Sequence, residues 1–185
     1  MTARTGRGAA TAVKLAVGLV LTALAIVHTA GSDGYESYII GMIALTAIVG
    51  VGLNVLMGLA GQISLGHIGF YAIGAYAVGI VATKLGASFW LGLALGTMLA
   101  GAVGCLLALP AVRLSGPYLA MVTIAFAFVV EHGLVEWKTL TGGANGLSGL
   151  PPVDLPGGPA SNETLAAITV GLAGLSLLLF GLLRA

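Results

Sequence analysis

The side chains that could do chemistry are few in this chain, and the densest group of them lies in one short polar segment. Gln62, Ser64 and His67 fall close together; Gly61 precedes them and Gly66 stands between Ser64 and His67. In an apolar surrounding such polar groups are costly unless they face protein or water, and glycines allow a helix to break. Two interpretations stay open. The segment is either a helix break beside a path for a polar solute, or a plain turn that Gln62 and Ser64 cap while His67 packs inside.

Two further polar residues stand within apolar runs. Glu131 precedes His132 and lies about 20 Å beyond Tyr118 if the run is helical. It is either an acid at a membrane interface or an acid that faces a water-filled vestibule. Asn54 lies shortly before the polar segment, where a hydrogen bond to another helix and a contact with a solute are the alternatives.

The sequence holds no arrangement typical of catalysis, metal binding or cofactor binding. It has no GxSxG elbow, no HExxH motif and no pair of carboxylates at a useful spacing. The glycine-rich TGGANGLSG at 141–149 lacks the GK[ST] ending that places a lysine on a nucleotide phosphate. The single Cys105 forms no intrachain disulfide and belongs to no Cys/His spacing of a metal site. We therefore expect no enzyme activity, no metal and no cofactor.

The composition decides which elements position these residues. Hydrophobic residues make up 58% of the chain and charged residues 7%, whereas a soluble domain is about 25% charged. So few charges cannot cover an apolar core with a wetted surface, so the solvent is lipid. The net charge of +1 gives no reason to expect a nucleic-acid partner.

Apolar runs approach the roughly 20 residues that a helix needs to cross a bilayer. They lie at 13–30, 38–59, 63–83, 89–109, 118–136 and 164–183. Because helices satisfy their own backbone groups in lipid, these runs predict an all-α, polytopic transmembrane helix bundle of about six helices in one domain, residues 1–185. Pro110 is expected to end the fourth run, Gly116 and Pro117 to open the fifth, and residues 137–163 to form an external loop.

Basic residues orient this bundle. With the N-terminus in the cytoplasm, five basic residues fall on the cytoplasmic side and two outside. The inner group is Arg4, Arg7, Lys14, Arg113 and Arg184, and the outer group is Lys84 and Lys138. This bias follows the positive-inside rule and predicts a multi-pass protein with a cytoplasmic N-terminus. A cleaved signal peptide is the alternative for the first run, although its apolar part is long for one.

Small residues recur every four positions along the fourth run. They are Gly92, Gly96, Ala100, Gly104 and Ala108. Residues at this spacing share one helix face, and small residues let helix backbones approach closely in lipid. The pattern predicts a packing seam against another helix; a glycine-rich helix without a special partner is the alternative.

Two blocks of the sequence resemble one known family. GLNVLMGLAGQISLGHIGFYAIGAYAVGIV at 52–81 and LSGPYLAMVTIAFAFVVEHGLVEWKTLTGGANGLSGLP at 114–151 are similar to the LivM-type permeases of bacterial branched-chain amino-acid ABC transporters. The matching motif positions are Gly61, Gln62, Ser64, Leu65, Gly66, His67, Gly116, Pro117, Tyr118, Thr141, Gly142, Gly143, Asn145 and Gly146. One departure is that many members carry a Glu and then an Arg in the fifth helix, where this chain has Phe128 and Glu131.

The resemblance implies a permease in the bacterial inner membrane that pairs with a second, LivH-like permease, two cytoplasmic ATPases and an external solute-binding protein. It implies branched-chain amino acids, other amino acids, amides or urea as solutes, and it favours the path interpretation of Gln62, Ser64 and His67. A secondary transporter and a non-transporting membrane scaffold are the alternatives. Family members continue past Ala185 with a basic segment and further helices, so we expect this chain to be an incomplete permease.

Overall fold

The computed structural model describes residues 3–29, 31–59, 61–62, 64–111, 113–114, 116–155 and 158–183. Contacts between residues divide the chain into two compact units, Met1–Val55 with Ala160–Ala185, and Leu56–Pro159. The first unit holds α1 (Ala3–Thr29), most of α2 (Gly34–Gly58) and α7 (Asn162–Leu183). The second holds α3 (His67–Lys84), α4 (Phe89–Ala111), α5 (Pro117–Glu136), α6 (Lys138–Thr141) and the 3-10 turn η1 (Gly143–Asn145). The single permease domain expected from the sequence stays a prediction.

The predicted all-α class is confirmed, because 80% of the residues that the structure describes are helical. Among the described residues, strand is confined to the antiparallel pair β1 (Asp154–Leu155) and β2 (Gly158–Pro159). Within the part of the chain that the structure describes, four helices are long and apolar enough to cross a membrane: Gly34–Gly58, Phe89–Leu109, Pro117–Glu136 and Asn162–Leu183. Such helices satisfy the backbone groups of their interior within the helix, as lipid requires, so the chain is a multi-pass helical bundle.

The remaining two predicted runs are also helical. The run expected at 13–30 lies in α1 (Ala3–Thr29), in which Ala16–Thr29 forms an apolar stretch. Helix α3 begins at His67, not at 63, because the described residues before it, 61–62 and 64–66, take a non-helical course. Helix α4 continues one residue past Pro110, which therefore lies in the last turn and does not itself end the helix.

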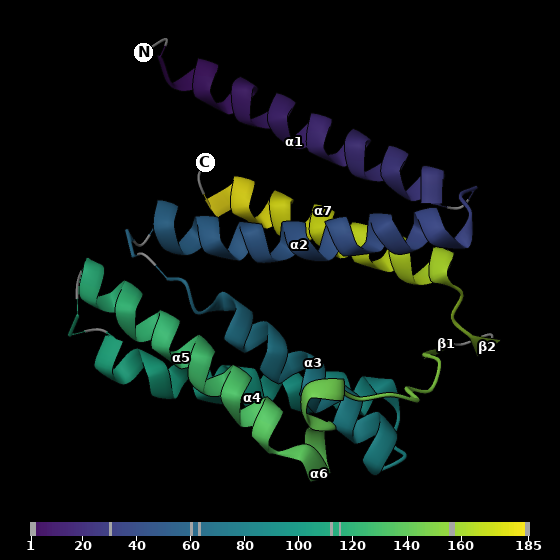
Figure 1. Ribbon diagram of the computed structural model, residues 1–185. Coiled ribbons are helices and arrows are strands. Elements are labelled where there is room, and N and C mark those ends of the chain that lie inside the picture. Colours follow the sequence, from purple (N-terminus) through teal and green to yellow (C-terminus); the bar gives the residue numbers. More distant parts are fainter. Residues whose placement is uncertain are drawn as a thin grey trace. The chain divides into compact units, whose positions relative to one another are not determined.

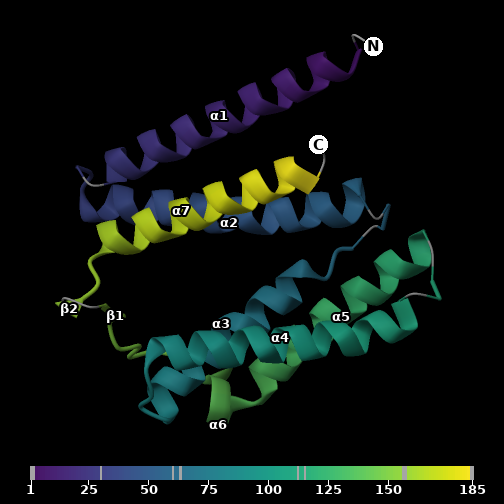
Figure 2. The same cartoon turned by 180° about the vertical axis from the view of Figure 1, so that it is seen from behind.

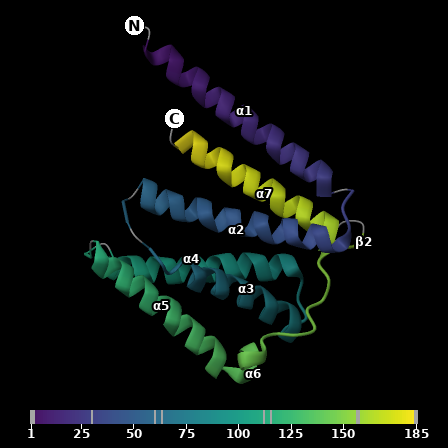
Figure 3. The same cartoon turned by 45° about the horizontal axis from the view of Figure 1, so that its top comes forward.

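In the first unit, α7 packs against both α1 and α2. Figure 3 shows α7 between these two helices. The buried side chains at its centre are Ala44, Val170 and Ala173, with Ala25, Ile26, Ile40 and Ile48 packed around them. Gly174 lies so close to the Thr22 side chain that a Cβ atom would collide with it. Small residues therefore set the close approach of these helices.

In the second unit, α3 contacts both α4 and α5 (Figures 1 and 2). Helix α4 runs antiparallel to α3, since Gly92 lies against Val78 and Gly104 against Phe70. Helix α5 runs parallel to α3, since Gly66 lies against Thr123 and Gly69 against Ala127. Three helices that cross one membrane in succession must alternate in direction, as α3, α4 and α5 do.

Some of the small residues that recur every four positions along α4 pack against α3. A Cβ atom added at Gly92 would be 3.1 Å from Val78 Cα, and one added at Gly96 would be 3.0 Å from the Gly74 carbonyl oxygen. Along the second half of the row, Ala100 is half-buried and Ala108 is exposed. The close contact with α3 is therefore concentrated at Gly92 and Gly96.

Candidate functional site

The polar segment begins with a tight turn that ends α2. Gly61 has a φ angle of +63°, which L side chains rarely adopt. The Gln62 N–H donates to the Leu56 carbonyl oxygen at 3.1 Å, which satisfies one of the last carbonyls of α2. The Gln62 side chain is exposed. Gly61 and Gln62 thus form the helix-ending turn that one of the two sequence interpretations requires.

The next residues leave this turn and dock on the side of α5. Ser64 and Gly66 are buried, and the Leu65 N–H donates to the Thr123 hydroxyl oxygen at 3.0 Å. The Thr123 hydroxyl in turn donates to the Ala120 carbonyl oxygen at 3.0 Å. Thr123 lies six residues after Pro117, which is about 9 Å along α5. Non-helical backbone therefore reaches well beyond the first turn of α5.

Glycines make this docking possible. A Cβ atom at Gly66 would be 2.8 Å from the Thr123 carbonyl oxygen. One at Gly69 would be 2.8 Å from Phe126. The Phe126 ring also packs on Phe70, with ring centroids 4.7 Å apart. The glycine spacing of the segment is thus explained by contact with α5.

His67 is the first residue of α3 and is half-buried. Its Nδ1 atom is buried and has no hydrogen-bond partner among the residues that the structure describes. An unpaired buried polar atom costs about 1–3 kcal/mol, so such atoms are rare outside functional positions. His67 therefore stays a candidate site residue on physical grounds.

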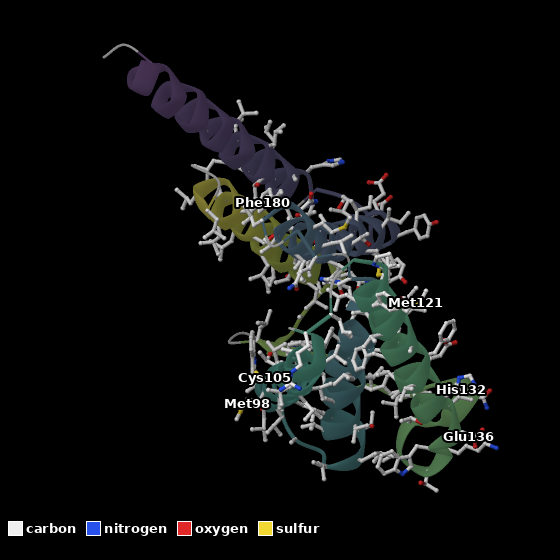
Figure 4. The ribbon with its side chains drawn as sticks, turned by 90° about the vertical axis from the view of Figure 1, so that its left-hand side faces the viewer. Met98, Cys105, Met121, His132, Glu136 and Phe180 are labelled. Atoms are coloured by element: carbon white, nitrogen blue, oxygen red, sulfur yellow. The ribbon has the colours of Figure 1, made fainter. Side chains whose placement is uncertain are left out.

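A groove of about 450 Å³ follows the line where α3 and α5 meet. Its lining residues are Leu65, Ile68, Gly69, Ala72, Tyr76, Ile124, Ala127, Phe128, Val130, Glu131, Leu134 and Val135. The wall is mainly apolar, and Glu131 carries the one charge among these residues. Met121, His132 and Glu136, which Figure 4 labels along α5, are not among the residues that line the groove.

Asn54 lies on α2, in the other unit, and its side chain is exposed. Its amide donates to the Gly50 carbonyl oxygen at 3.0 Å, within its own helix. The sequence suggested a hydrogen bond from Asn54 to another helix, whereas the structure shows one within α2.

The TGGANG motif forms a compact turn at the end of α5. Thr141 is 2% exposed, and its hydroxyl lies within hydrogen-bonding distance of the Leu134 and Trp137 carbonyl oxygens. The Gly143 N–H donates to the same hydroxyl at 3.2 Å. Gly142 and Gly143 have φ angles of +80° and +64°, and a Cβ atom at Gly142 would collide with the Gly146 carbonyl. Asn145 is exposed at the end of η1.

This turn covers part of α3. Leu147 and Leu150 approach α3 at Gly79, where a Cβ atom would be 2.8 Å from the Leu147 side chain. The first part of the predicted external loop, 137–163, is thus built from α6 and η1, which lie within the second unit; α6 contacts α3 and α5, and η1 contacts α5. At the other end of α5, Gly116 has a φ angle of +60° and Pro117 is the first helical residue, as expected from the sequence.

Sequence reasoning missed Thr123 and Phe126 on α5, which carry the docking, and Tyr76 on α3, which lines the groove. All three looked like ordinary residues of apolar helices. Thr123 gave one signal, because it is among the few polar side chains of α5. Within the described residues, no group of three His, Cys, Asp or Glu side chains could hold a metal ion.

These features define a polytopic α-helical membrane protein with a polar break between α2 and α3. The profile of the family described as branched-chain amino acid transport system / permease component matches residues 36–184. The chain belongs to this family, and the resemblance seen in the sequence is confirmed. The family consists of permease components of transport systems, which are not themselves enzymes.

Two curated relatives carry the name high-affinity branched-chain amino acid transport system permease protein LivM. The protein from Salmonella typhimurium is 42% identical over 123 residues, which cover 66% of this chain and 29% of the relative. The protein from Escherichia coli K12 is 41% identical over 110 residues, which cover 60% of this chain and 26% of the relative. The match thus spans less than a third of either relative. No solved structure matches the chain.

Proposed function

We propose that this chain is a permease subunit of an ABC importer in the bacterial inner membrane and forms part of its translocation path. Its solutes are branched-chain amino acids or related small polar solutes such as amides and urea. ATP is hydrolysed on separate subunits. Membership of the permease family and the 42% identity to a LivM protein support this proposal.

The observation that carries the proposal is the non-helical course of the described residues 61–62 and 64–66. Non-helical backbone at membrane depth is tolerated where it is buried in protein or lines a water-filled cavity. Broken helices of this kind often border the substrate path of transporters. Gln62, Ser64 and His67 lie on or next to this break, and Asn54 and Glu131 are the further candidates for the path.

The partners belong to the same proposal. They are a second, LivH-like permease, two cytoplasmic ATPases and an external solute-binding protein. The N-terminus lies in the cytoplasm, as the bias of Arg and Lys supports. Parallel packing of α3 and α5 supports the alternation of crossings that this topology needs. The side chains of Arg4, Arg7 and Lys14 and all of Arg184 lie outside the described residues.

Uptake of labelled leucine by the assembled transporter tests the proposal. Gln62→Leu and His67→Leu should each lower uptake about tenfold, the effect of about 1.4 kcal/mol on a barrier, while the amount of protein in the membrane stays the same. Thr97→Val is the matched control, because Thr97 is exposed on α4 and its hydroxyl bonds to its own helix.

Uptake should require ATP and survive an uncoupler that collapses the ion gradient. Uptake abolished by the uncoupler at constant ATP would instead indicate a secondary transporter. If Gln62→Leu and His67→Leu both transport as well as Thr97→Val, residues 61–67 form a structural turn and do not line the path.

A further inference from the structure

We propose that the groove between α3 and α5 is a solute site within the permease, with Glu131 as the acceptor for the solute's ammonium group. This inference rests on the proposed function and assigns a substrate class to one part of the path. The class is a small zwitterion with an aliphatic side chain. The groove lies wholly within the second unit, between elements whose contacts are defined.

The charge of Glu131 is the first argument. Glu131 lies fourteen residues after Pro117, about 21 Å along a helix that is long enough to cross the membrane. No ion pair or hydrogen bond engages its carboxylate among the described residues. Acids within transmembrane helices are costly and are kept where they pair with a partner or mark a substrate path. A cationic group of the solute supplies such a partner.

The walls of the groove are the second argument. Ile68 on α3 and Ile124 and Phe128 on α5 offer aliphatic and aromatic surface. The volume of about 450 Å³ lies within the range of small-molecule sites, about 300–1,000 Å³. Such sites combine apolar walls with a few polar groups that fix orientation. An aliphatic side chain therefore fits the walls while its ammonium group reaches Glu131.

A zwitterionic solute also needs a hydrogen-bond donor for its carboxylate group. Tyr76 is the lining residue whose side chain can donate a hydrogen bond. Its hydroxyl lies near Gly146, 3.8 Å from where a Cβ atom of that residue would be. Tyr76 lies midway along α3, with its hydroxyl near Gly146 of the TGGANG turn, and Glu131 lies in the last two turns of α5, the helix that leads into that turn. A solute held between them lies at one end of the groove, next to the external loop of the proposed topology.

The site is tested by equilibrium binding to the assembled complex of permeases and ATPases in lipid nanodiscs, without the solute-binding protein. Labelled leucine is displaced by 3-methylbutylamine, which lacks the carboxylate, or by 4-methylpentanoate, which lacks the ammonium group. The unmodified complex should bind leucine saturably and prefer the amine to the acid. Glu131→Gln should weaken binding of leucine and the amine about tenfold, as expected for loss of a charge-assisted hydrogen bond.

His132→Gln is the matched control. His132 is the next residue of α5, is exposed and does not line the groove, so this variant should bind leucine as the unmodified complex does. Glu131→Gln should leave the affinity for 4-methylpentanoate unchanged or raise it, which a collapsed groove would not do.

Three results would overturn the inference: no saturable leucine binding, equal affinities in Glu131→Gln and His132→Gln, or an equal loss of leucine and 4-methylpentanoate in Glu131→Gln. Uptake by the complete transporter separates this failure from failure of the proposed function. If the unmodified transporter imports leucine and Glu131→Gln binds and imports it equally well, the site is wrong and the permease function stands. If the unmodified transporter imports no branched-chain amino acid, the proposed function itself is wrong.

Discussion

Thr141 shows how one buried hydroxyl can organise a whole loop. Helix α5 ends at Glu136, which leaves its last carbonyls without helical partners. The Thr141 hydroxyl lies against one of them, the Leu134 oxygen, and accepts the N–H of Gly143. The left-handed Gly142 and Gly143 then turn the chain back toward α3. The polar and glycine residues of this motif therefore hold a turn together, which makes the motif structural.

Replacing Thr141 by Val keeps the shape of the side chain and removes its hydroxyl. The buried Leu134 carbonyl and Gly143 N–H then lose a partner, which should lower the local stability of the turn by about 1–3 kcal/mol. Amide hydrogen exchange at residues 140–146 measures this change as faster exchange. Thr139→Val is the control, since Thr139 is exposed in the same short helix. Equal exchange in both variants would show that the hydroxyl does not hold the turn.

The polar residues of the site could be found from the sequence, but their partners could not. Gln62, Ser64 and His67 stand out because their neighbours are apolar. The hydrogen bond from Leu65 to Thr123 joins residues 58 positions apart, and no local pattern encodes it. Asn54 shows the same limit, because a polar side chain in a helix can bond either to its own backbone or to another helix.

At the scale of elements, the apolar runs predicted the helices well and their ends less well. The run expected at 63–83 starts as helix only at His67. The hydropathy of residues 63–66 suits a helix. In the structure, however, Leu65 is hydrogen-bonded to Thr123 of α5 and Gly66 lies against the backbone of the same residue. Packing between distant segments therefore decided this boundary. The loop expected at 137–163 contains α6, η1 and a short hairpin, since five glycines with positive φ angles among its described residues allow compact turns there.

The docking of the polar segment on α5 predicts a strong effect of one methyl group. Gly66→Ala places a Cβ atom 2.8 Å from the Thr123 carbonyl oxygen, which is backbone and cannot turn away. Overpacking of this kind lowers the free energy of unfolding by about 1–3 kcal/mol. The drop should appear as a lower thermal unfolding midpoint of the purified protein in detergent.

Gly74→Ala is the matched control within α3. A Cβ atom there meets no atom within 4 Å, and alanine is the better helix former. Its unfolding midpoint should equal or exceed that of the unmodified protein. A Gly66→Ala midpoint as high as that of Gly74→Ala would mean that the segment does not rest on α5 as described.

At the scale of the whole molecule, the composition was sufficient to predict a polytopic helix bundle, because a chain with 7% charged residues has lipid as its main solvent. The composition could not predict the division into two units, which depends on α7 returning to α1 and α2. The curated relatives are more than three times as long as the matched region. The path, the partners and the solute of the complete transporter therefore remain proposals that the experiments above address.

The orientation of the chain in the membrane gives the last prediction. Helix α5 has 20 residues and a length of about 30 Å, the thickness of the hydrocarbon core. Arg113 precedes it and Ser148 follows it, and both side chains are exposed. With the N-terminus in the cytoplasm, Ser148→Cys should react with a membrane-impermeant maleimide in intact cells from which the outer membrane has been removed. Arg113→Cys should react only after the inner membrane is opened.

Both variants need a Cys105→Ala background, because Cys105 is exposed on α4 and would react itself once a reagent reaches it. Ser148 is the better position for this label than the buried Gly143, whose φ angle of +64° strains any other residue. The basic residues are the physical reason for the expected result, since lysine and arginine are retained on the cytoplasmic side. Labelling of Arg113→Cys in intact cells, with Ser148→Cys protected, would reverse the orientation and place the TGGANG turn in the cytoplasm.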